Sequence, residues 1–397
     1  MNSPNNAVSD IYRYALEKVD FYRSGYPSVD SVVNFSDVPF LSRKQTLENV
    51  NMLLSDEYRS YPLSKTITVE RSLGKTGEYL KTLWSADDYT ASLGILDKYR
   101  KDWHRVGKGS KQLRFHTALY QGNMIVSNKQ IVVEDGIMSI YCFAMNRENA
   151  PDISRQIMEF APDCLVAPPS IAFQMARLFT CMNLPLPESL KYIELTGEES
   201  GEEAINLIQS TFHVRPVNLY SVKGLGGIAF ECSSGSLHVL KENVFVEIVK
   251  DGKPVFGEEG EIVVTTLTNH AMPLIRYKTG DVGILSNAPC PCGCSSPVLE
   301  IKVGRKCALH LLEDGNFVSE YSLKSIIEHA NENISCAIAQ ARFAWVSEGS
   351  ISVILQLKPS YYGWDTAAIA EFLNNVPCTI FSLVFEFVFS SNYDHLT

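Results

Sequence analysis

The chain of 397 residues lacks the features by which several large classes of protein are recognised. It has no apolar run approaching the roughly 20 residues of a membrane span. It has no cluster of Lys and Arg that would follow nucleic-acid phosphates, and its net charge is −10. Internal repeats and low-complexity segments are also absent. We therefore expect a folded protein that binds neither membranes nor nucleic acids.

The first residues, Met1-Asn-Ser-Pro-Asn-Asn, lack the basic and apolar regions of a signal peptide. The ten cysteines are scattered along the chain. Without a secretion signal, reduced thiols in the cytoplasm are the expectation, and a few of these thiols are candidates for binding metal. The sequence does not indicate an oligomeric state.

Length and patterning predict more than one domain. Hydrophobic residues make up 45% of the chain and charged residues 20%, and the length exceeds what one core usually supports. Residues 8–25 have the spacing of an amphipathic helix, and Ser42 is a candidate cap for the next helix. A further helix, capped by Asp87 or Ser85, is expected to continue through Tyr99.

Strands and helices alternate between residues 130 and 180. The clearest helix covers residues 153–161, and the buried strand Cys164–Ala167 follows it. Such alternation is typical of mixed sheets covered by helices. The fold class we predict is α/β, with these sheets in a large N-terminal domain.

Short strands divided by Gly and Pro follow from about residue 237, and one of them is expected at Met272–Arg276. They predict a small β-rich subdomain over about 232–300. After residue 303 the pattern becomes that of a small α+β domain, so we place the domains at 1–303 and 304–397. In the second domain we expect a helix over 321–331 and strands at 350–358 and 379–389.

A nucleotide motif is only half present in the stretch from Glu70 to Thr82. This stretch contains Gly74-Lys75-Thr76, the end of a Walker phosphate loop. The Walker loop needs a glycine five residues before Gly74, and Val69 stands there. The stretch is therefore either a different phosphate loop or an ordinary turn.

Four residues with metal-binding side chains fall into two close pairs, Cys232 with His238 and Cys290 with Cys292. Thiolate and imidazole on tight turns suit a tetrahedral Zn²⁺, and four protein ligands make such a site structural. Cys294 competes for the fourth position. The alternative is that these are unrelated loop thiols and a solvated histidine.

Three strand-to-loop junctions carry polar residues suited to a ligand. They are Gly197-Glu198-Glu199, the loop from Tyr220 to Gly224, and Asp281 after Gly280. Ligands dock at such junctions in open α/β sheets, and a carboxylate there accepts hydrogen bonds from ribose hydroxyls. Taken singly, each is equally compatible with a plain turn.

The order of these signals along the chain resembles the adenylate-forming (acyl-CoA synthetase-like) superfamily. The similarity is greatest to its branch of phenylacetate–CoA ligases and capsule-biosynthesis proteins. Glu258–Asp281 is the most specific segment; Ala161–Ser170, Gly197–Glu199 and Gly304-Arg305 also match that branch. The Cys/His set is similar to the metal site of the branch.

The resemblance implies that ATP and a small carboxylic acid form an acyl-adenylate and pyrophosphate. The mobile C-terminal domain then rotates, and CoA, a carrier protein or an amine takes the acyl group. Residues that this implies for nucleotide binding are Ser72, Gly74, Thr76 and Gly77 on the phosphates, Gly197, Glu198 and Tyr220 on the adenine side, and Asp281 and Arg305 on the ribose. Those implied for the acid are His116, Pro169, Ser170 and Gly224; a lone histidine such as His116 is otherwise a structural group.

Several positions depart from the family pattern. Lys75 and Glu78 replace the usual Thr and Lys of the loop, and Gly224 replaces the glutamate that holds Mg²⁺. The tail from residue 390 contains no lysine for the adenylation transition state. Lys75 and Lys223, with Thr76, are the candidates to compensate as catalytic groups.

Two other functions stay open because of these departures. One is transfer of an already activated acyl group to form an amide or ester, with Lys223 or His116 as the working group. The other is a binding or partner protein that no longer adenylates.

Overall fold

The structure is a computed structural model. It describes the chain except for residues 1–5, 30–33, 60–66, 74–78, 108, 117–119, 122–123, 126–129, 142–144, 146, 304–308, 312–316, 320–326, 328–337, 348–349, 358–383 and 391–397. The chain divides into two units. Unit 1 consists of Met1–Arg71, Leu80–Lys108 and Val217–Arg305, and unit 2 of Ser72–Tyr79, Gly109–Pro216 and Lys306–Thr397. The boundary at residues 303 and 304 stays a prediction.

Unit 1 begins with two helices, α1 (Asn6–Lys18) and α2 (Asp20–Gly25), where the sequence predicts one. Val19 separates them because its backbone is extended and forms a bridge with Ser55. The predicted cap at Ser42 is confirmed: its hydroxyl accepts from the backbone N–H of Gln45 at the start of α3 (Arg43–Glu48). Short 3₁₀ turns lie at Phe35–Asp37 and Asp56–Tyr58.

The hairpin strands β1 (Ile67–Leu73) and β2 (Tyr79–Ser85) lead into α4 (Ala86–His104). Ser85, not Asp87, caps α4, since its hydroxyl accepts from the N–H of Asp88 at 3.0 Å. The helix runs past the predicted end at Tyr99 and stops at Arg105, which adopts the left-handed conformation with φ 60°.

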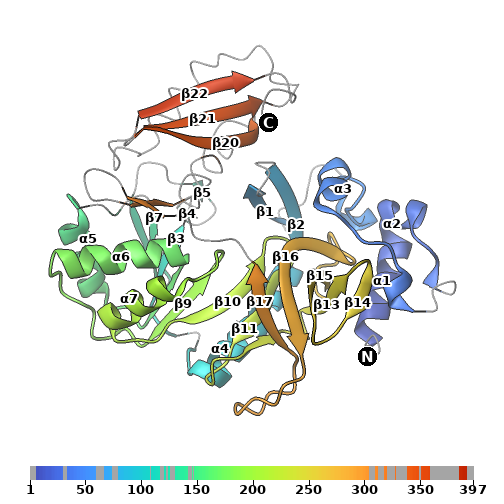
Figure 1. The fold of residues 1–397 in the computed structure, drawn as a ribbon, viewed down its shortest axis with the longest axis horizontal. Helices are drawn as coiled ribbons and strands as arrows, with labels where there is room; N and C mark the ends of the chain where they lie inside the picture. The colour runs from blue at the N-terminus through green and yellow to red at the C-terminus, as the bar shows by residue number, and fades with distance from the viewer. Residues whose placement is uncertain are drawn as a thin grey trace. The chain divides into compact units, whose positions relative to one another are not determined.

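The β-rich part of unit 1 is confirmed, and it starts earlier than predicted. Its strands are β10 (Val217–Val222), β11 (Gly226–Glu231), β12 (Leu237–Val239), β13 (Val244–Lys250), β14 (Lys253–Val255), β15 (Glu259–Thr266), β16 (Tyr277–Ser286) and β17 (Val298–Val303). Their order is β14-β13-β15-β16-β17-β12-β11-β10. Strands β13, β15, β16 and β17 form an antiparallel run (Figure 1).

The predicted strand at Met272–Arg276 is wrong. Thr266 and Thr265 hydroxyls accept from the N–H groups of Leu274 (3.0 Å) and Arg276 (2.9 Å), so side chains replace a strand partner. Arg276 also has a φ of 50°, which no strand accommodates. The apolar side chains of this segment are buried as the sequence suggests, but in a loop that precedes β16.

Distant parts of the chain meet in the core of unit 1. The Tyr22 hydroxyl, fully buried on α2, donates to the carbonyl of Pro273 at 2.8 Å. It also accepts from the N–H of Ile275 at 3.1 Å. Apolar side chains of α1, α2 and the strands form one cluster around this contact.

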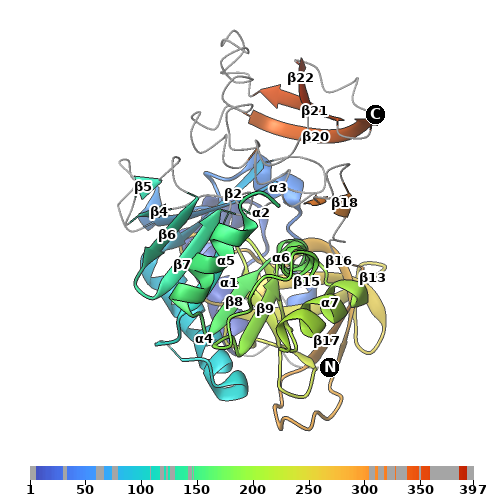
Figure 2. The ribbon, with the colours of Figure 1, turned by 90° about the vertical axis from the view of Figure 1, so that its left-hand side faces the viewer.

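Unit 2 contains a mixed sheet covered by helices, as predicted. Its elements before residue 217 are β3 (Gln112–His116), β4 (Tyr120–Gln121), β5 (Met124–Ile125), β6 (Ile131–Glu134), β7 (Ile137–Tyr141), α5 (Ala150–Phe160), β8 (Cys164–Ala167), α6 (Pro169–Cys181), β9 (Tyr192–Thr196) and α7 (Glu202–Phe212). The order β9-β8-β3-β7-β6 is parallel except for the hairpin β6–β7 (Figure 2).

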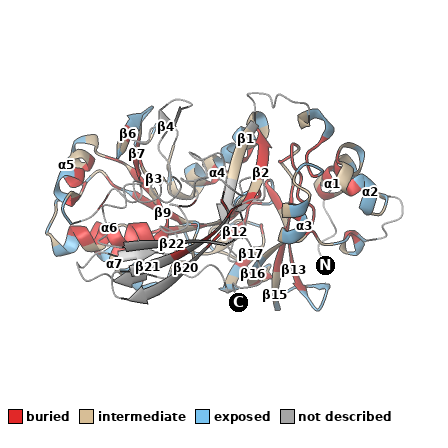
Figure 3. Cartoon of the chain, turned by 90° about the horizontal axis from the view of Figure 1, so that it is seen from above, coloured by how far each residue is buried: buried red, intermediate tan, exposed pale blue. Residues whose placement is uncertain are grey.

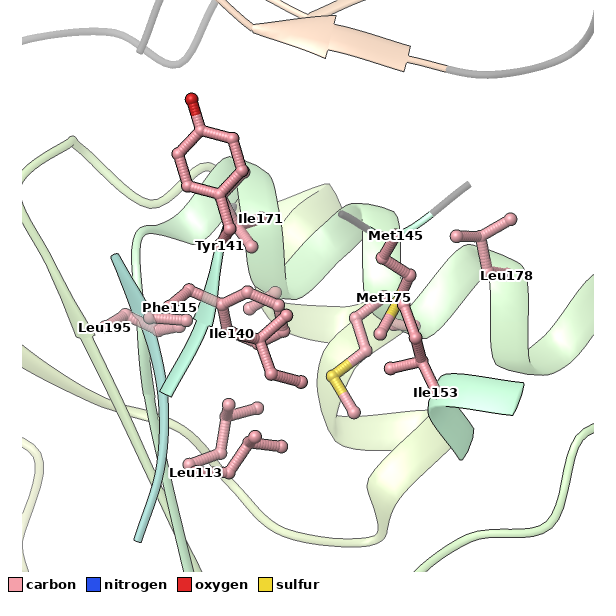
Figure 4. Packing of buried hydrophobic residues seen from close by; sticks show 14 of the residues in the cluster. Leu113, Phe115, Ile140, Tyr141, Met145, Ile153, Ile171, Met175, Leu178 and Leu195 are labelled. Atoms are coloured by element: carbon pink, nitrogen blue, oxygen red, sulfur yellow. The ribbon is translucent and has the colours of Figure 1, made fainter. Parts of the chain in front are cut away.

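Helix α6 is the central helix of this unit and is buried along nearly its whole length (Figure 3). Its sequence is apolar on almost every side, which suits a helix packed on several faces. Ile171, Met175 and Leu178 of α6 meet Leu113 and Ile140 of the sheet in one cluster (Figure 4).

The C-terminal strands belong to unit 2. They are β18 (Leu309–Leu311), β19 (Phe317–Ser319), β20 (Ile338–Ser347), β21 (Ser350–Leu357) and β22 (Val384–Ser390), with β20-β21-β22 in one sheet. The predicted strand at 350–358 is confirmed as β21, and the one at 379–389 overlaps β22. The predicted helix at 321–331 lies outside the described residues apart from Ile327. Among the described residues, none of the helices combines the length and apolar composition needed to cross a membrane.

Candidate functional site

Four metal-ligating side chains converge in unit 1. The ligand atoms of Cys232, His238, Cys290 and Cys292 all lie within 4.8 Å of one another. The Cys232 and Cys290 sulfurs are 3.6 Å apart, and the Cys292 sulfur is 3.3 Å from His238 Nε2. A tetrahedron built on Zn–S bonds of about 2.3 Å has edges of about 3.8 Å, so the donor set fits Zn²⁺ in size and chemistry.

His238 is held in the tautomer that a metal requires. Its Nδ1 lies 2.9 Å from the carbonyl oxygen of Ser296. A carbonyl only accepts, so Nδ1 carries the proton, and the lone pair of Nε2 is directed to Cys292. The ring is fully buried and packs 5.7 Å from Trp103 of α4. The orientation of this ligand is therefore fixed before any cation binds.

The loop that carries the second pair of ligands is a tight turn. Gly293 has φ 76° and donates from its N–H to the carbonyl of Cys290 at 3.0 Å. The N–H of Cys294 points at the Cys292 sulfur (3.4 Å), while the Cys294 sulfur accepts from Ser296 N–H (3.4 Å). Cys294 is thus outside the converging set of four.

The thiols of this loop have very different acidities. A hydrogen bond from Ser236, aided by the N–H of Cys292, lowers the pKa of Cys290 to about 5. Burial raises the pKa of Cys292 to about 12. A divalent cation bound by these sulfurs would displace the protons that the thiols still carry.

A second constellation in unit 1 joins an aromatic ring to a buried carboxylate. The Tyr220 hydroxyl on β10 donates to Asp281 Oδ2 on β16 at 3.0 Å, and Asp281 is only 2% exposed. A bulge at residues 279–281 places Asp281, since these three residues of β16 lie opposite Ile262 alone. Gly280 permits the bulge with φ 75°. Asp281 therefore lies within a strand, not past its end as the sequence suggests.

The turn between β10 and β11 carries Lys223 and Gly224. The N–H of Leu225 donates to the carbonyl of Val222 at 2.9 Å, and Gly224 has φ 88°, which is the geometry of a type II turn. Lys223 is exposed at the tip of this turn. A Cβ on Gly224 would lie 2.6 Å from Thr82 Cγ2, so the structure has no room here for the glutamate of the family pattern.

In unit 2 the residues predicted to contact the acid or the adenine lie at the carboxyl ends of the parallel strands. His116 ends β3, Pro169 and Ser170 follow β8, and Gly197 and Glu198 follow β9. The Glu198 carboxylate accepts from the N–H of Ser170 at 3.1 Å, at the N-terminus of α6. Neighbouring parallel strands bring these ends together, and this edge is where α/β sheets bind ligands.

Two buried side-chain oxygens at this edge make no hydrogen bond within the described part of the chain. Neither Ser170 Oγ nor Glu199 Oε2, both buried, has a hydrogen-bond partner there. Buried polar atoms are usually satisfied, so such atoms at a strand edge suit a ligand. Burial, and then the charge of Arg114, lowers the pKa of His116 to about 4, so its imidazole is neutral at pH 7.

Comparison with known proteins shows relatives of one kind. No family model matches the chain. It is 33% identical over 151 residues to a phenylacetate–coenzyme A ligase of Thermus thermophilus, over 35% of this chain and 34% of that one. It is 22% identical to the phenylacetate–coenzyme A ligase of Escherichia coli over 68% of this chain and 63% of that one. It is 21% identical to Protein CapK of Staphylococcus aureus over 94% of this chain and 86% of that one.

The fold is similar to that of a solved acyl-CoA ligase. A 2-hydroxyisobutyryl-CoA ligase, solved with 2-HIB-AMP and CoA, matches 99% of this chain and 87% of its own with a TM-score of 0.63 and 17% identity. The chain is thus similar in sequence to phenylacetate–coenzyme A ligases and in fold to an acyl-CoA ligase. Its matches cover only about a third of the Thermus ligase and just under two thirds of the Escherichia coli ligase, so activity, substrates and partners are proposals.

The other predicted nucleotide residues lie in or next to a segment outside the described residues, apart from Ser72. Gly74, Lys75, Thr76, Gly77 and Arg305 lie outside the described residues, and Ser72 is in β1. Their roles stay predictions.

Two residues with notable contacts or unsatisfied atoms, Glu70 and Glu199, receive no role from the sequence. Glu70 precedes the predicted phosphate loop, and its carboxylate contacts Gly224 across the sequence. Glu199 lies in the Gly197–Glu199 segment that matches the family pattern, but the resemblance implies a nucleotide role only for Gly197 and Glu198. Glu70 falls on a polar position of the alternating strand Thr66–Glu70, so the sequence carries no signal that sets it apart.

Proposed function

We propose that this protein is an adenylate-forming enzyme that activates a small carboxylic acid with ATP and transfers the acyl group to the thiol of CoA. In the first step a carboxylate oxygen attacks the α-phosphorus of ATP, and pyrophosphate leaves from the opposite side. In the second, the thiolate attacks the acyl carbon and AMP leaves. This is the ligase activity named for the relatives and structural neighbours of the chain.

The hydrogen bond between Tyr220 and Asp281 carries the proposal. It brings together the ring predicted to pack on adenine and the carboxylate predicted to hold the ribose hydroxyls. An ionised carboxylate has about four lone-pair sites and can accept from several hydroxyls at once. A nucleoside presented to this pair would be bound by stacking and by charge-assisted hydrogen bonds, which are about twice as strong as neutral ones.

The edge of the parallel sheet in unit 2 is proposed to receive the acid. Ser170 offers a hydroxyl, and the neutral imidazole of His116 offers one donor and one acceptor without adding charge. Pro169 begins α6 beside them. The N-terminus of α6, which the Glu198 carboxylate contacts, favours negative groups.

We propose that lysines of the chain, and Mg²⁺ that enters with ATP, neutralise the negative charge of the phosphates. Lys223 is exposed on the turn next to Gly224, and Lys75 and Thr76 belong to the predicted phosphate loop. Losing one charge-stabilising donor commonly slows a reaction about 10²–10³-fold, so these lysines are expected to be needed. Lys223→Ala and Lys75→Ala test this by pyrophosphate release that depends on the acid.

Zn²⁺ is proposed as a structural ion at Cys232, His238, Cys290 and Cys292. Bound there, it would cross-link the loop after β11, strand β12 and the loop before β17 without an open coordination position.

The proposal is tested by nucleotide binding. A ligand at 100 times its Kd adds about 2.7 kcal/mol of stability, which raises Tm by about 5–10 °C for a domain of this size. We expect AMP and ATP with Mg²⁺ to do so, and Asp281→Asn to remove more than half of the shift. Asp251→Asn is the matched control, because Asp251 is exposed on the β13–β14 turn and Asn tolerates its φ of 51°.

Screening carboxylic acids by pyrophosphate release, and then CoA, carrier-protein and amine acceptors by product analysis, identifies the substrates. No stabilisation by ATP, AMP or acyl-CoA would refute the proposal and support a binding or partner protein. Stabilisation by acyl-CoA alone would support transfer of a pre-activated acyl group.

A further inference from the structure

Glu70 on β1 makes two hydrogen bonds in unit 1 through a single oxygen. Its Oε2 accepts from the N–H of Gly224 at 2.7 Å and from the indole N–H of Trp84 at 2.9 Å. Trp84 on β2 is fully buried, so the carboxylate is held from one side by a rigid group. Residues 70 and 224 are 154 positions apart, and this contact ties β1 to the turn between β10 and β11.

The N–H of Gly224 belongs to the central peptide of that turn. A type II turn uses the N–H of its fourth residue, here Leu225, and leaves the N–H of the central peptide without a partner inside the turn. Glu70 supplies that partner. The central peptide has the opposite direction in a type I turn, so the Glu70 bond favours one orientation of this peptide and of the lysine that precedes it.

Packing of the Val222–Leu225 turn against β2 also favours this conformation of the turn. The close approach of Gly224 to Thr82 leaves no space for a Cβ, so the turn is pressed onto the strand that also carries Trp84. Two residues before the turn begins at Val222, Tyr220 donates to Asp281. The conformation of the turn therefore affects both the Tyr220 ring and the Lys223 side chain.

We infer that Glu70 is a positioning residue for nucleotide binding: it holds the Val222–Leu225 turn in the one conformation that presents Tyr220 and Lys223. The inference rests on the proposed adenylation function. When only a fraction of molecules has the competent turn, the apparent Kd for the nucleotide rises in inverse proportion to that fraction. A hydrogen bond to a charged acceptor contributes about 1.5–3 kcal/mol, so its loss is expected to reduce affinity about tenfold or more.

The positioning role requires an acceptor oxygen at the place of Glu70 Oε2 and does not require a negative charge. Because both donors meet the same oxygen, the amide oxygen of glutamine can accept both bonds. Aspartate keeps the charge but is one methylene shorter, so it cannot reach both donors. A residue that bound a cation or took a proton would show the reverse order of tolerance.

The experiment is titration of the full-length protein with AMP by calorimetry. We expect Glu70→Gln to bind within about threefold of wild type, and Glu70→Asp and Glu70→Ala to bind about tenfold more weakly. Trp84→Phe, which keeps the Gly224 bond, is expected to stay within about threefold. The matched control is Glu242→Ala, which removes another carboxylate that accepts from an aromatic side chain, the Tyr99 hydroxyl at 2.8 Å; its affinity should be unchanged.

The outcomes separate the inference from the function it rests on. If wild type binds AMP and Glu70→Ala binds it equally well, the positioning role is wrong while the proposed function stands. Tolerance of Asp but not Gln would also overturn it, in favour of a charge-based role. If wild type binds neither AMP nor ATP, both fail. Should Glu70→Ala not fold, the order of Gln and Asp still decides.

Discussion

Replacing Arg276 by Met should lower the free energy of unfolding of unit 1 far more than a substitution on the surface does. Arg276 is 1% exposed and forms a two-point ion pair with Glu247, with Nε–Oε2 2.9 Å and Nη2–Oε1 3.0 Å. Its third nitrogen donates to the carbonyls of Ser36 and Val38, and the guanidinium lies 4.2 Å from the centre of the Phe40 ring.

The size of the stability loss follows from the charge of Glu247, which stays buried when Arg276 is removed. Removing one member of a buried ion pair costs about 3–5 kcal/mol, because the other charge stays buried without its partner. Burial already raises the pKa of Glu247, and the Arg276 charge opposes this. In Arg276→Met the pKa of Glu247 rises further, so the carboxyl group takes up a proton on folding.

The sign of the pH dependence is thereby fixed. A carboxyl whose folded pKa lies above its unfolded value stabilises the protein below the unfolded pKa, about 4.3, and loses that stability as pH rises through the folded value. Arg276→Met should therefore cost more at pH 8 than at pH 5. The assay is urea unfolding followed by circular dichroism and tryptophan fluorescence at both pH values.

Two further variants make the reasoning refutable. The double variant Arg276→Met with Glu247→Met should regain most of the lost stability, since no buried charge remains. The control Lys250→Met removes a pair whose side chains are 52% and 59% exposed, and should cost at most about 1 kcal/mol. If Arg276→Met costs no more than this control, or the double variant is no more stable than the single one, the account is wrong.

Other predictions concern the metal set, the turn and the strand edge. Purified protein should contain about one equivalent of zinc by elemental analysis, which Cys292→Ser lowers and Cys294→Ser leaves unchanged. Gly224→Ala should lower stability by about 1–3 kcal/mol in urea unfolding, because alanine is strained at φ 88° and meets Thr82. The pKa of His116, lowered to about 4 from 6.5, means that stability is full above pH 6.5 and falls by up to about 3 kcal/mol as pH drops towards 4. His116→Gln should abolish that fall in urea unfolding measured between these pH values.

The convergence of Cys232, His238, Cys290 and Cys292 was predictable because metal-binding chemistry is carried by residue type. Few side chains bind Zn²⁺, and proline and glycine between Cys290 and Cys294 mark the tight turn. Family order implied separate nucleotide roles for Tyr220 and Asp281, but not the hydrogen bond between them. The bulge that places Asp281 depends on pairing with β15 and leaves no local signature.

The failures share a physical reason: the deciding partner is remote in the sequence. Met272–Arg276 reads as a strand by composition, but threonine hydroxyls take its N–H groups and Glu247 holds its arginine. The break at Val19 depends on a bridge to Ser55. Glu70 had no visible role because its acceptor oxygen meets a turn that begins 152 residues later, at Val222 (222 − 70).

The contact of Tyr22 with Pro273 and Ile275 has a consequence for how the protein is made. The hydroxyl joins residues up to 253 positions apart, with all of Gly109–Pro216 between them. At about 5–20 residues per second, a ribosome adds the 253 residues from Tyr22 to Ile275 in about 13–50 s, and the Tyr22 hydroxyl lacks these two partners during that time. The segment Gly109–Pro216 of unit 2 can therefore be synthesised before α2 makes these contacts. Slowing translation near the middle of the chain should lengthen the exposure of the apolar face of α1, and binding of holding chaperones to stalled chains would report it.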